Sequence, residues 1–135
     1  MKNLNSNLFY ALIIDHEKKD HFLLRRTINN AVPQVLIESL YDEEETIAYF
    51  EKCKTKPSLI FLDMNMHTIF LKFVLYTVRT TKLLSKVPVA IINSSRDEKN
   101  REELRVFGVA EFYSGLERKI EQKLISLDLR HKWLT

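Results

Sequence analysis

Five short apolar runs, separated by longer amphipathic stretches, are the feature of this sequence that most constrains its fold. The runs cover residues 9–14, 33–40, 58–62, 89–92 and 109–113. The segments between and after them have helical spacing, over residues 18–30, 42–50, 69–84, 97–107 and 117–127. Continuous apolar runs are typical of strands buried on both faces, and strands that alternate with helices indicate a parallel sheet.

The connections between such strands limit how the sheet can be ordered. Crossovers between parallel strands are right-handed, and for five strands the order 2-1-3-4-5 is the commonest outcome. We therefore predict an α/β protein, a flavodoxin-like (βα)5 three-layer sandwich around a parallel five-stranded sheet in that order. A chain of 135 residues is the size of one domain, and we expect residues 1–135 to form one, with its core over about 8–127 and a short C-terminal extension.

The composition excludes several classes of protein. The only glycines are Gly108 and Gly115, so the sequence has no glycine-rich phosphate loop and no nucleophile elbow. The single cysteine, Cys53, rules out an internal disulfide framework and a four-cysteine zinc site. The 21 basic and 18 acidic residues leave a surplus too small to predict nucleic-acid binding. Residues 1–6 are polar and lack the apolar run of a signal peptide, and each apolar run is far shorter than the roughly 20 residues of a membrane helix. We expect a cytoplasmic protein with neither nucleic acid nor membrane as partner.

Acidic residues follow the first and third predicted strands. Asp15 comes after the run at 9–14 and Asp63 after the run at 58–62. Because ligands of such sheets bind beyond the carboxyl ends of the strands, we expect these two carboxylates to lie side by side. Converging carboxylates suit a hard divalent cation such as Mg²⁺, and a carboxylate beside such a cation can accept a phosphoryl group.

The segments around these acids carry a resemblance to a known family. From about residue 8 to residue 127 the chain resembles a receiver domain of a two-component response regulator, and most of all the stand-alone receivers of the cyanobacterial phytochrome response regulator type. The matching text is LIIDHEKKD at 12–20, PSLIFLDMNM at 57–66, VPVAIINSS at 87–95 and GVAEFY at 108–113.

The resemblance implies roles for four residues. Asp63 takes the place of the phosphoacceptor of the family, and Asp15 matches the first residue of its acidic pair. These two acids and the backbone carbonyl of Asn65 would bind Mg²⁺. Phe112 matches the aromatic residue on the last strand whose rotamer reports activation.

Other positions depart from the pattern of the family. His16 stands where the second acid of the pair, a metal ligand, is expected. Asn93 stands at the serine or threonine that contacts the phosphoryl group, although Ser94 follows it. Gly115 stands at the lysine that neutralises phosphoryl charge in the family. This atypical active site predicts weak Mg²⁺ binding.

Three interpretations of His16 are open. A neutral imidazole would shift the preference of the metal site toward borderline metals such as zinc. A protonated imidazole would pair with Asp63 in place of a cation. A loop histidine could also simply face the solvent. The other three histidines, at positions 21, 67 and 131, are predicted to lie at the surface.

The resemblance predicts a signalling protein and not an enzyme. A sensor histidine kinase or phosphotransfer protein would pass a phosphoryl group to Asp63 in a phosphorelay. A downstream protein effector, or a second copy in a homodimer, would bind the surface of residues 97–127, and no output domain is expected. The alternative is a pseudo-receiver, an interaction module that works without phosphorylation. A small aspartate phosphohydrolase is disfavoured, because Asn65 stands where a second carboxylate is needed.

Overall fold

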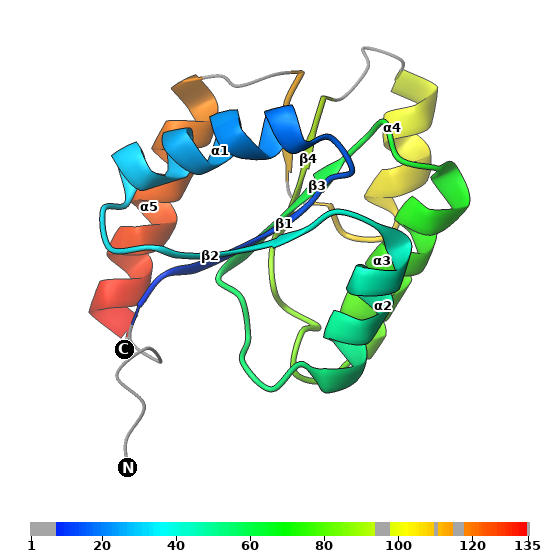
Figure 1. Cartoon of the computed structure of the whole chain (residues 1–135), viewed down its shortest axis with the longest axis horizontal. Coiled ribbons are helices and arrows are strands. Elements are labelled where there is room, and N and C mark those ends of the chain that lie inside the picture. Colours follow the sequence, from blue (N-terminus) through cyan, green and yellow to red (C-terminus); the bar gives the residue numbers. More distant parts are fainter. Residues whose placement is uncertain (1–7, 94–97, 110, 115–117, 135) are drawn as a thin grey trace.

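Five strands and five helices alternate along the part of the chain that the structure, a computed structural model, describes: residues 8–93, 98–109, 111–114 and 118–134. Figure 1 shows a central sheet with helices on both of its faces. The elements are β1 (Tyr10–Ile14), α1 (Lys18–Ala31), β2 (Leu36–Leu40), α2 (Glu43–Lys52), β3 (Leu59–Asp63), α3 (Thr68–Thr80), β4 (Val89–Ile92), α4 (Glu98–Arg105), β5 (Glu111–Phe112) and α5 (Arg118–Leu134).

The sheet is parallel, and its strand order is β2-β1-β3-β4-β5, which confirms the predicted topology. Ile14 of β1 pairs with Leu62 of β3. Asp15 follows Ile14 and Asp63 follows Leu62, so the register of the two strands alone brings the two aspartates to the same edge of the sheet.

Two apolar layers hold the helices against the sheet. Helices α1 and α5 lie on one face and α2, α3 and α4 on the other (Figure 1). Under α1 and α5, Leu24 and Leu124 pack in one cluster with Phe61 of β3. On the opposite face Val74 of α3 packs with Leu62. Neighbouring residues of β3 therefore serve opposite layers, as the alternation of side chains along a strand requires.

The start of α2 shows why the acidic run at 42–45 begins a helix. The Asp42 carboxylate accepts a hydrogen bond from the backbone N–H of Glu45 at 2.8 Å. The Glu45 carboxylate accepts one from the backbone N–H of Tyr41, also at 2.8 Å. This reciprocal capping satisfies donors that the first helical turn leaves unpaired, and the acids also face the positive end of the helix dipole.

Several predicted boundaries are wrong. The helix expected to reach residue 84 ends at Thr80; Leu84 is fully buried, but it reaches the core from a turn. The last helix continues from the expected 127 to Leu134, and an ion pair of 3.0 Å between Asp128 and Lys132 supports the added turns. β2 begins at Leu36 because Pro33 lies in a turn. β5 has only two residues, Glu111–Phe112.

The described helices include none whose length and apolar character would allow it to cross a membrane.

Candidate functional site

The side chains of Asp15 and Asp63 both lie buried at the carboxyl edge of the sheet. The Asp15 Oδ1 atom accepts a hydrogen bond from the backbone N–H of Glu17 at 2.9 Å. In the same way, the Asp63 Oδ1 atom accepts one from the backbone N–H of Asn65 at 3.0 Å. Each carboxylate thus caps the loop that follows its strand, a local role that aspartate often has in turns.

The two oxygens of Asp63 have different surroundings. Besides the Asn65 N–H, Oδ1 accepts a hydrogen bond from the Asn93 side-chain amide at 3.2 Å. Oδ2 is buried and accepts no hydrogen bond from the described residues. Leaving a buried acceptor unpaired costs about 1–3 kcal/mol, and more when it is charged. An oxygen held in this state is what a site for a cation or a covalent modification requires.

The imidazole of His16 lies close to this oxygen. Its Nδ1 atom lies 3.8 Å from Asp63 Oδ2, too far for a hydrogen bond, and the imidazole side chain is 48% exposed. One ligand atom each from Asp15, His16 and Asp63 lie within 4.8 Å of one another. This separation allows one cation to contact all three groups. The three residues predicted at the acidic end of the site are therefore brought together.

The donors of this cluster fit a divalent cation, but only in part fit Mg²⁺. The two buried carboxylates are the ligands that Mg²⁺ prefers. The imidazole of His16 suits borderline metals such as zinc better than a hard cation. Asn65 lies next to the cluster because its backbone N–H faces Asp63. A metal-binding role for its carbonyl remains a prediction.

Asn93 approaches Asp63 from β4 in an unusual backbone conformation. Its φ of 55° lies in the left-handed region, which asparagine tolerates better than most residues other than glycine. This conformation follows directly after the strand and accompanies the contact of the side-chain amide with Asp63. Two further predicted site residues, Ser94 and Gly115, lie outside the residues that the structure describes.

Phe112, the predicted switch residue, is half-buried on β5 and packs beneath α4. The guanidinium carbons of Arg101 and Arg105 lie 5.6 and 5.3 Å from the centre of its ring. These distances are typical of cation–π contacts. The ring therefore links the last strand to α4, some way along the sheet from the carboxylates.

The prediction that His21 lies at the surface is wrong. Its side chain is only 2% exposed, and its Nε2–H donates a hydrogen bond to the backbone carbonyl of Asp15. The imidazole also packs on Tyr41, with 4.3 Å between ring centres. His21 shares the spacing of Leu24 and Ile28 along α1, so helical periodicity could have identified it as buried. It supports the loop that carries Asp15.

The other two histidines differ from each other. His67 is exposed, as predicted, and its Nδ1 atom accepts a hydrogen bond from the backbone N–H of Ile69 at the start of α3. His131 is half-buried, not at the open surface, because its ring packs edge-on against Phe9 with 6.2 Å between centres.

Comparison with known proteins depends on structure, since no family model and no curated protein matches the sequence. A signal receiver domain of a two-component histidine kinase from Clostridium thermocellum is similar, with a TM-score of 0.74 and 16% identity over 92% of this chain and 97% of that one. The receiver domain of a DNA-binding response regulator from Colwellia psychrerythraea has a TM-score of 0.75 and 18% sequence identity, over 90% of this chain and 98% of that one. The phosphorylated cyanobacterial phytochrome response regulator RcpA has a TM-score of 0.68 and 20% sequence identity, over 94% of this chain and 91% of that one.

This chain has the fold of a response-regulator receiver domain. The likeness extends over nearly the whole length of each neighbour. The identities are low, and the likeness establishes the fold alone. The chemistry of this receiver has to be argued from its own residues.

Proposed function

We propose that this receiver accepts a phosphoryl group on Asp63 in a two-component phosphorelay. One observation carries the proposal: Oδ2 of the buried Asp63 accepts no hydrogen bond from the described residues and lies within a cluster of possible metal ligands. Such an oxygen is available as a nucleophile, whereas Oδ1 is held by two donors.

The transfer forms one bond and breaks another. Asp63 Oδ2 would attack the phosphorus of a phosphohistidine on a sensor histidine kinase or phosphotransfer protein. The new O–P bond replaces the P–N bond, whose electron pair leaves with the imidazole, which then takes up a proton. A metal ion bound there would neutralise charge on the phosphoryl oxygens. Asp15, Asp63 and the Asn65 carbonyl would hold that ion, with His16 as the atypical ligand.

The product of this reaction remains attached to the chain, so the role is that of a cytoplasmic signalling protein and not of an enzyme. The modified receiver would bind a downstream protein effector, or a second copy, through α4, β5 and α5. Phe112 supports this choice because it contacts α4 from β5 through Arg101 and Arg105. A change in the position of its ring would therefore alter the surface of both elements.

A pseudo-receiver that works without phosphorylation is the second candidate. One observation favours it: Oδ1 of Asp63 already accepts hydrogen bonds from the Asn65 N–H and the Asn93 side-chain amide. Donors to the carboxylate are present without a phosphoryl group, as a purely structural aspartate would require.

Phosphorylation by a small phosphodonor separates the two candidates. The purified chain would be incubated with acetyl phosphate and Mg²⁺ and followed by intact-protein mass spectrometry. We expect slow addition of one phosphoryl group to the wild type and to the control Asp128→Asn, and none to Asp63→Asn. If neither acetyl phosphate nor a phosphorylated phosphotransfer protein labels the wild type, the pseudo-receiver is the correct assignment.

A further inference from the structure

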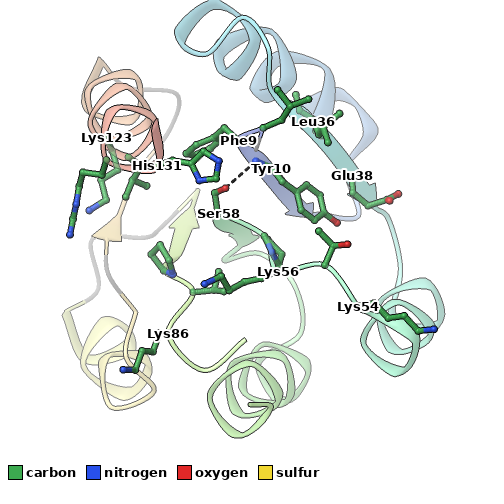
Figure 2. Close-up of a pocket in the computed structure, with 18 residues that line it drawn as sticks. Phe9, Tyr10, Leu36, Glu38, Lys54, Lys56, Ser58, Lys86, Lys123 and His131 are labelled. Carbon is green, nitrogen blue, oxygen red and sulfur yellow. Dashed lines mark hydrogen bonds between the residues drawn. The ribbon is translucent and has the colours of Figure 1, made fainter. Parts of the chain in front are cut away.

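A broad cleft lies at the amino edge of the sheet, opposite the edge that carries Asp63. It encloses about 1110 Å³ where β1, β2, β3 and β4 begin, and the last turns of α5 form one side. Figure 2 looks into this cleft, with Tyr10 and Ser58 near its centre. The Ser58 Oγ atom accepts a hydrogen bond from the Tyr10 backbone N–H at 3.0 Å, which joins the starts of β1 and β3.

The lining of the cleft concentrates the positive charge of the chain. It contains five of the 21 lysines and arginines and one of the 18 acids, Glu38, a surplus of four. The whole chain has a surplus of only three, so everything outside the cleft sums to minus one. The five basic residues are Lys54, Lys56, Lys86, Lys123 and Arg130.

Among the described residues, most of these cations have no acid that neutralises them. Lys123 lies 3.8 Å from Glu111. Lys54, Lys56, Lys86 and Arg130 are exposed and form no ion pair with the acids of the described residues. Cations near the carboxyl ends of helices are favourable in themselves, and α2 ends just before Lys54. The helix dipole does not explain why cations from several separate segments line the same cleft.

The arrangement of the cations indicates the shape of the ligand. They come from the loop before β3, the loop before β4 and α5, and Figure 2 shows Lys54 on one side of the cleft and Lys86 and Lys123 on the other. Positive charge on two sides of one hollow suits a compact anion with several charges, whereas an extended nucleic-acid strand needs a groove that tracks its backbone. The volume of the cleft lies slightly above the roughly 300–1,000 Å³ that is typical of small-molecule sites.

The centre of the cleft is suited to a flat organic group. Tyr10 and His131, both half-buried, lie near the middle of the cleft, and the half-buried Pro88 adds apolar surface. Small-molecule sites typically combine such a floor with a few polar or charged groups.

We propose that this cleft binds a compact, multiply phosphorylated small molecule, of the kind represented by a nucleoside polyphosphate. The phosphates would lie among Lys54, Lys56 and Lys86, and the ring would lie against Tyr10 and His131. The site is separate from Asp63, so a receiver of this kind would combine a phosphoacceptor site and an independent anion-binding site at opposite edges of one sheet.

Titration calorimetry with ATP and with inorganic tripolyphosphate tests the proposal, in buffer with EDTA so that no metal bridges ATP to the carboxylates. We expect saturable 1:1 binding of ATP that weakens as salt increases. Lys56→Gln together with Lys86→Gln should weaken it by at least about tenfold, the scale of one charged hydrogen bond. The control Lys19→Gln with Lys119→Gln removes the same charge from exposed positions outside the cleft and should leave binding unchanged.

Two further titrations show which part of ATP is bound and whether Asp63 takes part. Binding of tripolyphosphate as tightly as ATP would assign it to the phosphates, and tighter binding of ATP would add the contact with the ring. Asp63→Asn should bind ATP like the wild type, which keeps this test independent of phosphorylation. Absence of saturable binding, equal weakening in the control variant, or binding only of a single-stranded RNA oligonucleotide would overturn the proposal.

Discussion

Replacing Arg79 with methionine is expected to destabilise the protein more than any other surface-accessible change in α3. Arg79 lies in the last turn of the helix and is half-buried. Its guanidinium donates hydrogen bonds to four backbone carbonyls, those of Phe107 at 2.9 Å, Ser85 at 3.3 Å, Val87 at 2.8 Å and Gly108 at 2.7 Å. One side chain therefore joins the end of α3 to the segments that lead into β4 and β5.

The magnitude follows from these bonds. Three of the four are 2.9 Å or shorter, and a typical intramolecular hydrogen bond contributes a net ~1 kcal/mol. Burial lowers the pKa of Arg79, which shows that desolvating the guanidinium offsets part of this gain. Methionine keeps the apolar stem, so the loss is mainly one of hydrogen bonds. We expect the free energy of unfolding to fall by about 2–4 kcal/mol.

Urea unfolding followed by far-UV circular dichroism measures this change. Arg26→Met is the matched control, because Arg26 is exposed on α1, and surface substitutions of this kind usually change stability by less than about 0.5 kcal/mol. If Arg79→Met lies within about 0.5 kcal/mol of the wild type, the four bonds contribute nothing to folding and the reasoning fails.

Three further changes test other parts of the structure. Gly108 has a φ of 78°, and a Cβ atom there would lie 2.8 Å from the Arg79 Nε atom, so Gly108→Ala should cost about 1–2 kcal/mol in urea unfolding. That cost should be smaller in the Arg79→Met background, and an identical cost in both backgrounds would show that the two residues do not interact. His16→Asp should tighten Mg²⁺ binding in titration calorimetry, because an oxygen ligand replaces an imidazole; unchanged or weaker binding would place residue 16 outside the metal site. His21→Leu should cost about 1 kcal/mol and shift the amide resonances of Asp15, whereas unchanged resonances would contradict its supporting role.

The fold and the meeting of the two carboxylates could be predicted because both depend on short-range patterns. Apolar runs followed by acids give the strands and their ends, and the parallel register places Asp15 beside Asp63. Helix boundaries were harder to predict. Leu84 continues the helical pattern of α3, yet it is buried from a turn, and an apolar residue does not reveal which kind of segment buries it.

Contacts between distant segments could not be predicted. Arg79 and Phe107 are 28 residues apart, and no repeating pattern relates an arginine to the carbonyls of a later loop. The left-handed conformation of Asn93 could not be predicted from the sequence either, because most asparagines do not adopt it. The burial of His21 was predictable from its spacing on α1, and only its contact with the Asp15 carbonyl needed the structure.

Asn93 also limits how strongly this receiver can respond to phosphorylation. A modification shifts a conformational equilibrium only through contacts that differ between the two states. The phosphoryl group would carry nearly two negative charges in place of the single charge of the carboxylate, and it would add three acceptor oxygens. The Asn93 amide, however, already donates to Oδ1 of the unmodified Asp63 at 3.2 Å. Its contact is therefore largely present before transfer and contributes little to the difference. Phosphorylation of Asp63 should consequently produce only small amide shifts around Phe112 in NMR spectra, whereas large shifts there would show that another group supplies the missing contacts.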